Sequence, residues 1–258
     1  PDKTVQLSGT AAVLTSALTG TVTDAAGDKI EGTVTITEAN PNLSDLQSIN
    51  NAVNGIIEIQ DKTLALSGTA AALAEALAGT VREVTTGAAI TGNMTLTSDP
   101  NATQLQTINN ATAGNVIIPN AGITLSGTPA VLVEALTGSV ATAGSAKISG
   151  KVTITGGNPD AAQLKSINDA TDGAIDIPSK LVALSGNADV LAAALTGTVR
   201  EVTSGDKITG NVTIADTPTE AELQTINNAT TASIQIPAAN QTFTAAADVL
   251  AEALTGTV

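Results

Sequence analysis

The chain has 258 residues, of which 42% are hydrophobic; Phe243 is its single aromatic residue, and cysteine and histidine are absent. The lack of cysteine excludes disulfides and thiolate metal sites, and the lack of histidine removes the commonest general base and nitrogen metal ligand. The net charge of −14 argues against nucleic acid and anionic membrane surfaces as partners, because phosphate binding needs clustered lysine and arginine. The sequence contains no apolar run of the roughly 18 residues that a membrane span needs.

The stretch Leu7–Gly20 recurs every 59 residues. Its first residue returns as Leu66, Leu125, Leu184 and Phe243, and its last as Gly79, Gly138, Gly197 and Gly256. The period predicts one repeat array over residues 1–258, as a segment of a longer array. Its units are 1–59, 60–118, 119–177 and 178–236, followed by a partial unit, 237–258.

Each unit is predicted to open with a short strand, such as Thr4–Leu7 or Thr63–Leu66, followed by a helix. The helix N-cap positions hold side chains that accept hydrogen bonds: Thr10, Thr69, Thr128 and Asn187. Pro129 occupies a first helical position, where proline is tolerated. Leucines four residues apart form the apolar face, namely Leu14/Leu18, Leu73/Leu77, Leu132/Leu136, Leu191/Leu195 and Leu250/Leu254. The in-phase glycines, Gly20 onward, are expected at left-handed helix ends.

Two extended runs joined by a tight turn come next, for example Val81–Val84 and Asn93–Thr97. A second helix is predicted after N-caps at Asn42, Asn101, Asp160 and Thr219. Three residues further on stand the capping-box partners Asp45, Gln104, Gln163 and Glu222. Its buried face is Leu46/Ile49, Leu105/Ile108, Leu164/Ile167 and Leu223/Ile226. The closing strands are Ile56–Ile59, Val116–Ile118, Ile175–Ile177 and Ile234–Ile236.

Each unit is thus read as two similar halves of strand, short helix and strand. Alternate units are more alike than neighbours, because Val81–Thr85 returns as Val199–Thr203. The predicted fold class is α/β: a right-handed repeat solenoid of short parallel strands flanked by short helices. Which side of the sheet the helices cover stays open.

Two sets of repeated polar residues each have a functional and a structural interpretation. Asparagines recur in phase and either line a polar groove or, as we favour, stack in a ladder or cap helix ends: Asn50, Asn109, Asn168 and Asn227. The Thr33/Thr35/Thr37 run could present hydroxyls to ice or a polysaccharide. Its irregular equivalents favour ordinary strand propensity instead: Asn93, Lys151, Asn211 and Ala215.

Oxygen-rich clusters stand beside prolines, at Asp99–Asn101, Asn158–Asp160 and Asp216–Pro218. Calcium prefers such ligands, but no calcium-binding motif is present, so helix capping is the favoured interpretation. Carboxylate pairs such as Glu201/Asp206 fall in surface turns. We therefore predict no catalytic, cofactor-binding or metal-binding residue, and no enzyme. Glycosylation sequons occur at Asn42, Asn93, Asn101, Asn110, Asn211, Asn228 and Asn240, and their use needs a glycosylating compartment.

Two stretches of the sequence resemble known proteins. Residues 7–20 read Leu-Ser-Gly-Thr-Ala-Ala-x-Leu-x-x-Ala-Leu-x-Gly, and residues 212–230 read Val-Thr-Ile-x-x-x-Pro-x-x-x-x-Leu-Gln-Thr-Ile-Asn-Asn-Ala-Thr. Over the whole chain they resemble the tandem repeats of giant secreted or cell-surface bacterial proteins, notably cyanobacterial ones. The resemblance implies export and a structural role, and it transfers no functional residue.

Together these observations predict a structural repeat segment of an extracellular filament, surface layer or adhesin stalk. Its expected partners are further copies of the same repeat or subunit, end to end, and surface glycans. The alternative is an extracellular binding module that presents a glycan or divalent-cation site on a repeated face. No cofactor is predicted, and calcium, the candidate ion, lacks a motif.

Overall fold

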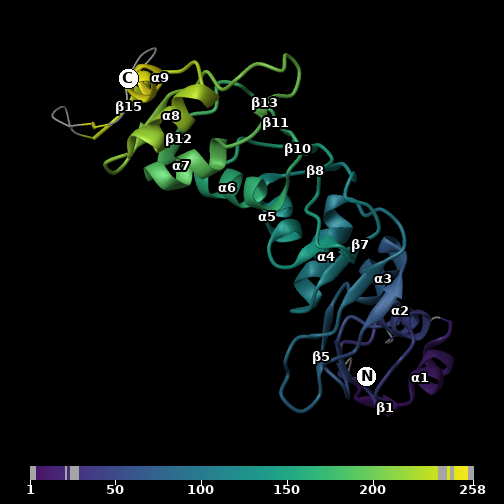
Figure 1. Cartoon of the computed structure of the whole chain (residues 1–258). Coiled ribbons are helices and arrows are strands. Elements are labelled where there is room, and N and C mark those ends of the chain that lie inside the picture. The colour runs from purple at the N-terminus through teal and green to yellow at the C-terminus, as the bar shows by residue number, and fades with distance from the viewer. Residues whose placement is uncertain (1–3, 21, 24–28, 238–242, 245–246, 255–258) are drawn as a thin grey trace. The chain divides into compact units, whose positions relative to one another are not determined.

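The computed structural model describes residues 4–20, 22–23, 29–237, 243–244 and 247–254 (Figure 1). It confirms an α/β fold, in which short parallel strands form four sheets and helices lie between the strands along the chain. The chain divides into two compact regions. The N-terminal region comprises residues 1–120 and 138–146, and the C-terminal region comprises 121–137 and 147–258.

The N-terminal region contains two four-stranded parallel sheets. The first has the order β1-β2-β3-β5, with bounds Leu7–Gly9, Val34–Ile36, Ile56–Ile59 and Thr80–Glu83. The second has the order β4-β6-β7-β9, with bounds Leu66–Gly68, Met94–Leu96, Val116–Ile118 and Val140–Thr142. The two sheets therefore interleave along the sequence.

The C-terminal region repeats this topology. One sheet has the order β8-β10-β11-β13, with bounds Leu125–Gly127, Val152–Ile154, Ile175–Ile177 and Val199–Glu201. The other has the order β12-β14-β15, with bounds Leu184–Gly186, Val212–Ile214 and Ile234–Gln235. The closing strands of all four units are thus found close to their predicted positions.

The fourth strand of each four-stranded sheet comes from the next sequence unit. In the first sheet Ile57 pairs with Val81, across the boundary between units 1–59 and 60–118. Val116 pairs with Val140 across the second boundary. Ile175 pairs with Val199 across the third. Parallel strand pairing therefore joins each of these units to its successor.

Two series of helices alternate along the chain. The first series follows the opening strands: α1 (Ala11–Leu18), α3 (Ala70–Ala76), α5 (Pro129–Leu136), α7 (Ala188–Leu195) and α9 (Ala247–Ala253). The second precedes the closing strands: α2 (Leu43–Ala52), α4 (Ala102–Ala111), α6 (Ala161–Ala170) and α8 (Glu220–Ala229). Successive helices pack on one another, from α1 to α4 in the N-terminal region and from α5 to α9 in the C-terminal region.

The predicted apolar faces of the first four units form the core, whereas the prediction is wrong for the Leu250/Leu254 pair at α9, since Leu254 is 48% exposed. The leucine pairs of α1, α3, α5 and α7 are buried, and so are the Leu/Ile pairs of α2, α4, α6 and α8. On the strands, alternate residues face this core: Val34 and Ile36 are buried while Thr35 between them is half-buried. Because the core uses leucine, isoleucine, valine and alanine almost throughout, each unit buries nearly the same set of shapes.

The opening strands were predicted three residues too early. They lie at Leu7–Gly9 and Leu66–Gly68, because the chain before Leu66 makes a turn in which the Leu64 amide donates to the Asp61 carbonyl at 3.2 Å. Pairing with β6 begins at Leu66, whose amide donates to the Asn93 carbonyl at 3.2 Å. Pairing with the neighbouring strand therefore decides where these strands begin, rather than the strand-like residues at Thr4–Leu7 and Thr63–Leu66.

The tight turn does not make a paired hairpin of the two extended runs. Val81–Val84 contributes to β5 and Asn93–Thr97 to β6, which belong to different sheets. An isolated antiparallel bridge between Arg82 and Ala89 marks the turn. Each run instead pairs in parallel with a strand more distant along the chain.

The glycine prediction holds at three helix ends and fails at one. Gly20, Gly138 and Gly197 have φ of 93°, 96° and 84°, the left-handed conformation that glycine adopts at low cost. The prediction is wrong for Gly79, because α3 ends earlier, at Ala76, and the Gly79 amide donates to the Leu77 carbonyl at 3.0 Å. The prediction for Gly256 lies outside the described residues.

The predicted N-caps are all in place, but they work in two ways. Full capping boxes occur at Asn101, Asp160 and Thr219, and Asn42 accepts from the Asp45 amide. In the other helix series, Thr69 and Thr128 cap through their side chains, whereas Thr10 and Asn187 make no such bond.

At α1 and α7, whose N-caps Thr10 and Asn187 make no side-chain cap bond, a carboxylate from the next half of the unit accepts from the first helical amide. The Ala188 amide donates to Asp216 Oδ1 at 2.8 Å, and the Ala11 amide donates to Glu38 Oε1 at 3.2 Å. In the third unit the equivalent helical position is Pro129, which has no N–H, and the equivalent acceptor position is Gly156, which has no side chain. Donor and acceptor are thus absent together, so no buried polar group is left unpaired there.

Replacing Thr219 with alanine should lower the free energy of unfolding by about 0.5–2 kcal/mol, because the capping box of α8 loses its acceptor. Thr10→Ala is the matched control: Thr10 occupies an N-cap but makes no side-chain cap bond, so its loss should be smaller. Urea unfolding of both variants measures the difference. Equal losses would mean that N-cap residue type, rather than the hydrogen bond, sets the cost.

Candidate functional site: the polar ladders of the sheets

The middle residues of paired strands form a row across the face of each sheet opposite the buried residues; we call each row a polar ladder. Strand alternation places these residues together, since most of the strand residues on either side of them are buried. In strand order the ladders are Ser8-Thr35-Glu58-Arg82, Ser67-Thr95-Ile117-Ala141, Ser126-Thr153-Asp176-Arg200 and Ser185-Thr213-Gln235.

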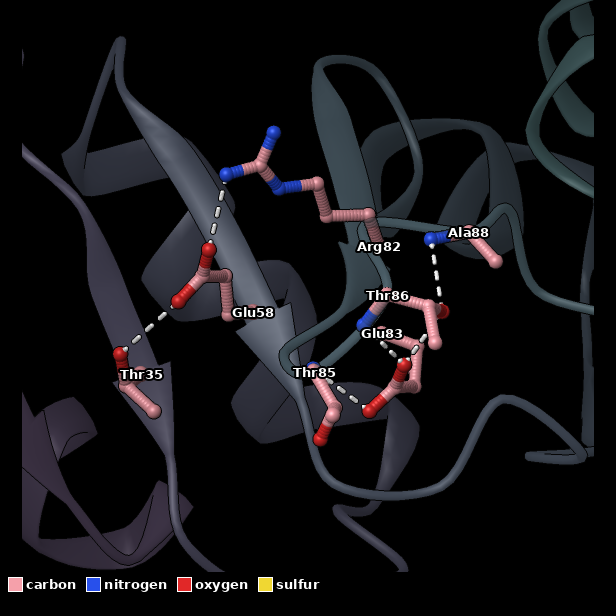
Figure 2. Close-up of polar contacts among 7 residues, drawn as sticks. All are labelled: Thr35, Glu58, Arg82, Glu83, Thr85, Thr86 and Ala88. Carbon is pink, nitrogen blue, oxygen red and sulfur yellow. Dashed lines mark hydrogen bonds and ion pairs between the residues drawn. The ribbon is translucent and has the colours of Figure 1, made fainter.

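The first ladder is joined by side-chain contacts (Figure 2). Arg82 Nη2 donates to Glu58 Oε1 at 2.8 Å, and Thr35 Oγ1 donates to Glu58 Oε2 at 3.3 Å. The Glu58 side chain is 15% exposed, and each of its two carboxylate oxygens is bound by one of these partners. The contacts link three adjacent strands, β2, β3 and β5.

The third ladder buries its carboxylate more deeply. The Asp176 side chain is 3% exposed, and it lies between Lys151 Nζ at 2.9 Å and Arg200 Nε at 3.0 Å. Burial raises the pKa of Asp176, but the hydrogen bonds and positive charges of Lys151 and Arg200 outweigh it and lower that pKa below its usual value. One carboxylate therefore holds two cations from the flanking strands β10 and β13 or their ends.

The second ladder carries no charge at the corresponding place. Ile117 pairs in register with Ala141, where the first and third ladders have an acid and an arginine. In the last ladder Thr213 Oγ1 donates to Gln235 Oε1 at 3.4 Å. Charged and neutral pairs therefore alternate from one unit boundary to the next.

A second carboxylate next to the first ladder organises a turn. Glu83 Oε1 accepts from the Thr85 amide at 2.7 Å, and Oε2 accepts from the Thr86 amide at 2.7 Å and the Thr86 hydroxyl at 2.6 Å (Figure 2). The Thr86 hydroxyl bond is the largest of the effects that lower the pKa of Glu83 to about 2. Glu201 holds the matching turn through the Ser204 and Thr203 amides, and these bonds lower its pKa too.

Glu83→Gln should destabilise the protein at neutral pH and do so less at low pH. The pKa of Glu83 falls from 4.5 to about 2 on folding, so the charged form stabilises the folded state above pH 4.5 and that contribution is lost as the pH falls towards 2. Urea unfolding of both proteins at pH 7, 4 and 2.5 should show the gap in unfolding free energy narrowing. A gap that is constant across these pH values would contradict the assignment.

Two of the four repeated asparagines, Asn50 and Asn168, cap helix ends, which is one of the two structural interpretations of their spacing. Asn50 Nδ2 donates to the Glu75 carbonyl of α3 at 2.6 Å, and Asn168 Nδ2 donates to the Ala193 and Thr196 carbonyls at 2.7 and 2.8 Å. Each of these asparagines thus binds the C-terminal turn of the helix in the next unit.

The oxygen-rich clusters also serve as helix caps, as predicted. Asn101 and Asp160 form capping boxes, and Asp216 accepts from the first amide of α7. Within the described residues, no group of three or more acidic side chains is placed to hold a metal ion. Glu201 is the last residue of β13 and Asp206 lies in the turn that follows it, where Asp206 binds Lys180. The threonines of the strands are partly engaged, since Thr35 binds Glu58.

A surface hollow of about 430 Å³ lies beside the C-terminal ends of α6 and α7. Its lining includes Lys147, Asp169 and Asp172, with the capping residue Asn168 at its wall. A second hollow, of about 400 Å³, is lined by β7 and β9 around Ile117 and Ala141. Both hollows are shallow surface features, and neither brings together the residues of a charged ladder.

Sequence reasoning missed the Lys151–Asp176–Arg200 cluster. Two signals were present: an aspartate between two core isoleucines, and the same separation of acid and arginine in Glu58/Arg82 and Asp176/Arg200. The arrangement binds strands together, because the oxygens of Glu58 and Asp176 are engaged by cations and hydroxyls of neighbouring strands.

Comparison with protein-family models, curated proteins and solved structures finds no match to this chain. Among the described residues, no helix has the length and apolar character that crossing a membrane requires.

Proposed function

We propose that the chain is a structural repeat segment that extends an extracellular filament, surface layer or adhesin stalk. In this proposal residues 1–258 form one α/β solenoid array of the four units and a partial fifth. The observation that carries it is the strand pairing across unit boundaries, at Ile57–Val81, Val116–Val140 and Ile175–Val199. The second, third and fourth units each supply a strand to the sheet of the preceding unit, and such an arrangement adds length by translation.

Further contacts at the boundaries support the proposal. The asparagine caps tie the second helix of one unit to the first helix of the next, as at Asn50–Glu75 and Asn168–Ala193. The ladder carboxylates Glu58 and Asp176 form ion pairs with arginines of neighbouring strands, so they stabilise the sheet. A net charge of −14 keeps such an extended object soluble, and the resemblance to repeats of exported bacterial proteins agrees with an extracellular place.

The alternative is a binding module for a glycan or divalent cation on a repeated face. One observation favours it: the first residue of each polar ladder is an exposed serine, at Ser8, Ser67, Ser126 and Ser185. Spaced hydroxyls suit hydrogen bonding to a polysaccharide. A rise in melting temperature with calcium or a soluble glycan would favour this function.

Duplicating residues 1–118 in frame, once and twice, tests the proposed function. Negative-stain electron microscopy should show elongated particles that lengthen by the same increment with each duplication. The melting temperature of each chain should be the same with and without calcium. Particles that stay compact, or that appear as separate beads of fixed size, would contradict a continuous array.

A further inference from the structure

The ladder pairs differ between unit boundaries in a regular way. At the first and third boundaries a carboxylate faces an arginine, Glu58–Arg82 and Asp176–Arg200. At the second boundary Ile117 faces Ala141. Parallel strand pairing recurs at all three boundaries, so the pairing alone does not distinguish one neighbour from another.

We propose that this residue pair selects which unit can follow which. A unit with an acid on its closing strand accepts only a unit with arginine on its incoming strand. A unit with a neutral residue on its closing strand accepts only a unit with a neutral residue on its incoming strand. The inference rests on the proposed function as a repeat array and names its assembly rule. Odd units carry the acid on their closing strand, Glu58 or Asp176. Even units carry the arginine on their incoming strand, Arg82 or Arg200, and a neutral residue on their closing strand, Ile117 or Gln235.

A wrong neighbour is disfavoured by desolvation. Glu58 is 15% exposed and Asp176 3% exposed, so an alanine opposite either would remove a cation from a carboxylate that water reaches poorly. An arginine opposite Ile117 would face an apolar side chain and no acid. The rule makes 118 residues, one odd and one even unit, the repeating element of the array, and it prevents strands from pairing one unit out of phase.

Reordering the units within the full chain tests the rule. With the units numbered along the chain, order 3-2-1-4 keeps parity, meaning that odd and even units still alternate. It sets Asp176 opposite Arg82, Ile117 opposite Thr23 and Glu58 opposite Arg200. Order 1-3-2-4 breaks parity, since it sets Glu58 opposite Ala141 and Ile117 opposite Arg200. Both chains have the same composition, the same junction sites and the same partial fifth unit.

The parity-keeping chain should melt within about 2 °C of the original, and the parity-breaking chain roughly 5–10 °C lower. Ala141→Arg with Arg200→Ala in the parity-breaking chain should restore most of that loss. Equal melting temperatures for the two orders, high or low, would overturn the rule, and so would a failed rescue. Failure of the proposed function is separate: the duplicated chains would then stay compact while the two orders still differ in melting temperature.

Discussion

Gly173→Ala is expected to lower the free energy of unfolding by on the order of 3 kcal/mol, the upper part of the range for overpacked sites. A methyl group at Gly173 would overlap the backbone carbonyl oxygen of Gly150 on the neighbouring strand segment. Backbone cannot rotate away as a side chain can, so the two segments must separate. Urea unfolding followed by circular dichroism measures the loss.

Gly157→Ala is the matched control in the same unit. Nothing lies within 4 Å of the position its methyl group would take, and its φ is not left-handed, so its stability should stay within about 0.5 kcal/mol of the original. The same close approach joins Gly55 to Gly32 and Gly114 to Gly92. If Gly173→Ala were as mild as the control, the backbone packing described for these pairs would be wrong.

The double variant Lys151→Met/Arg200→Met is expected to lose about 3 kcal/mol at pH 7. It leaves the Asp176 carboxylate buried, with a 3% exposed side chain and neither of its two cations. Adding Asp176→Leu to the double variant removes the stranded charge and should recover most of the stability, because an apolar side chain suits the site between Ile175 and Ile177.

The pH dependence of the two proteins should run in opposite directions. In the original chain the pKa of Asp176 is lowered, so its contribution is present above the unfolded pKa and is lost as the pH falls. In the double variant burial acts without the cations, so the pKa is raised and acid relieves the penalty. Chemical unfolding at pH 7 and pH 4 measures both. A double variant as stable as the original at pH 7 would show that the cations do not compensate Asp176.

Local features of the fold were predictable because their causes lie within a few residues. Thr219 and Glu222 form the capping box that their spacing predicts, and Leu46 and Ile49 are buried on one helix face. Pro129 stands at the first position of α5 as expected. Each of these depends on helix geometry alone, which the periodicity of the sequence encodes directly.

Strand partners were not predictable to the same degree. The strand at Val34–Ile36 pairs with residues Leu7–Gly9 on one side and Ile57–Glu58 on the other, and alternation within a short strand does not identify either partner. The Asp176 cluster escaped prediction for the same reason, since Lys151 and Arg200 reach it only once β10, β11 and β13 are paired. The site depends on register, and register depends on the whole sheet.

Native-state hydrogen exchange after deleting residues 1–59 tests most directly the claim that each unit is completed by its neighbour. The Val84 amide donates to the Ile59 carbonyl at 2.9 Å, whereas the Val152 amide donates to the Ala174 carbonyl at 2.9 Å within the C-terminal region. Nearest-neighbour stabilisation predicts that Val84 loses protection in the shortened chain while Val152 keeps the protection it has in the full chain. Loss of protection at both amides, or unchanged protection at Val84, would contradict the account.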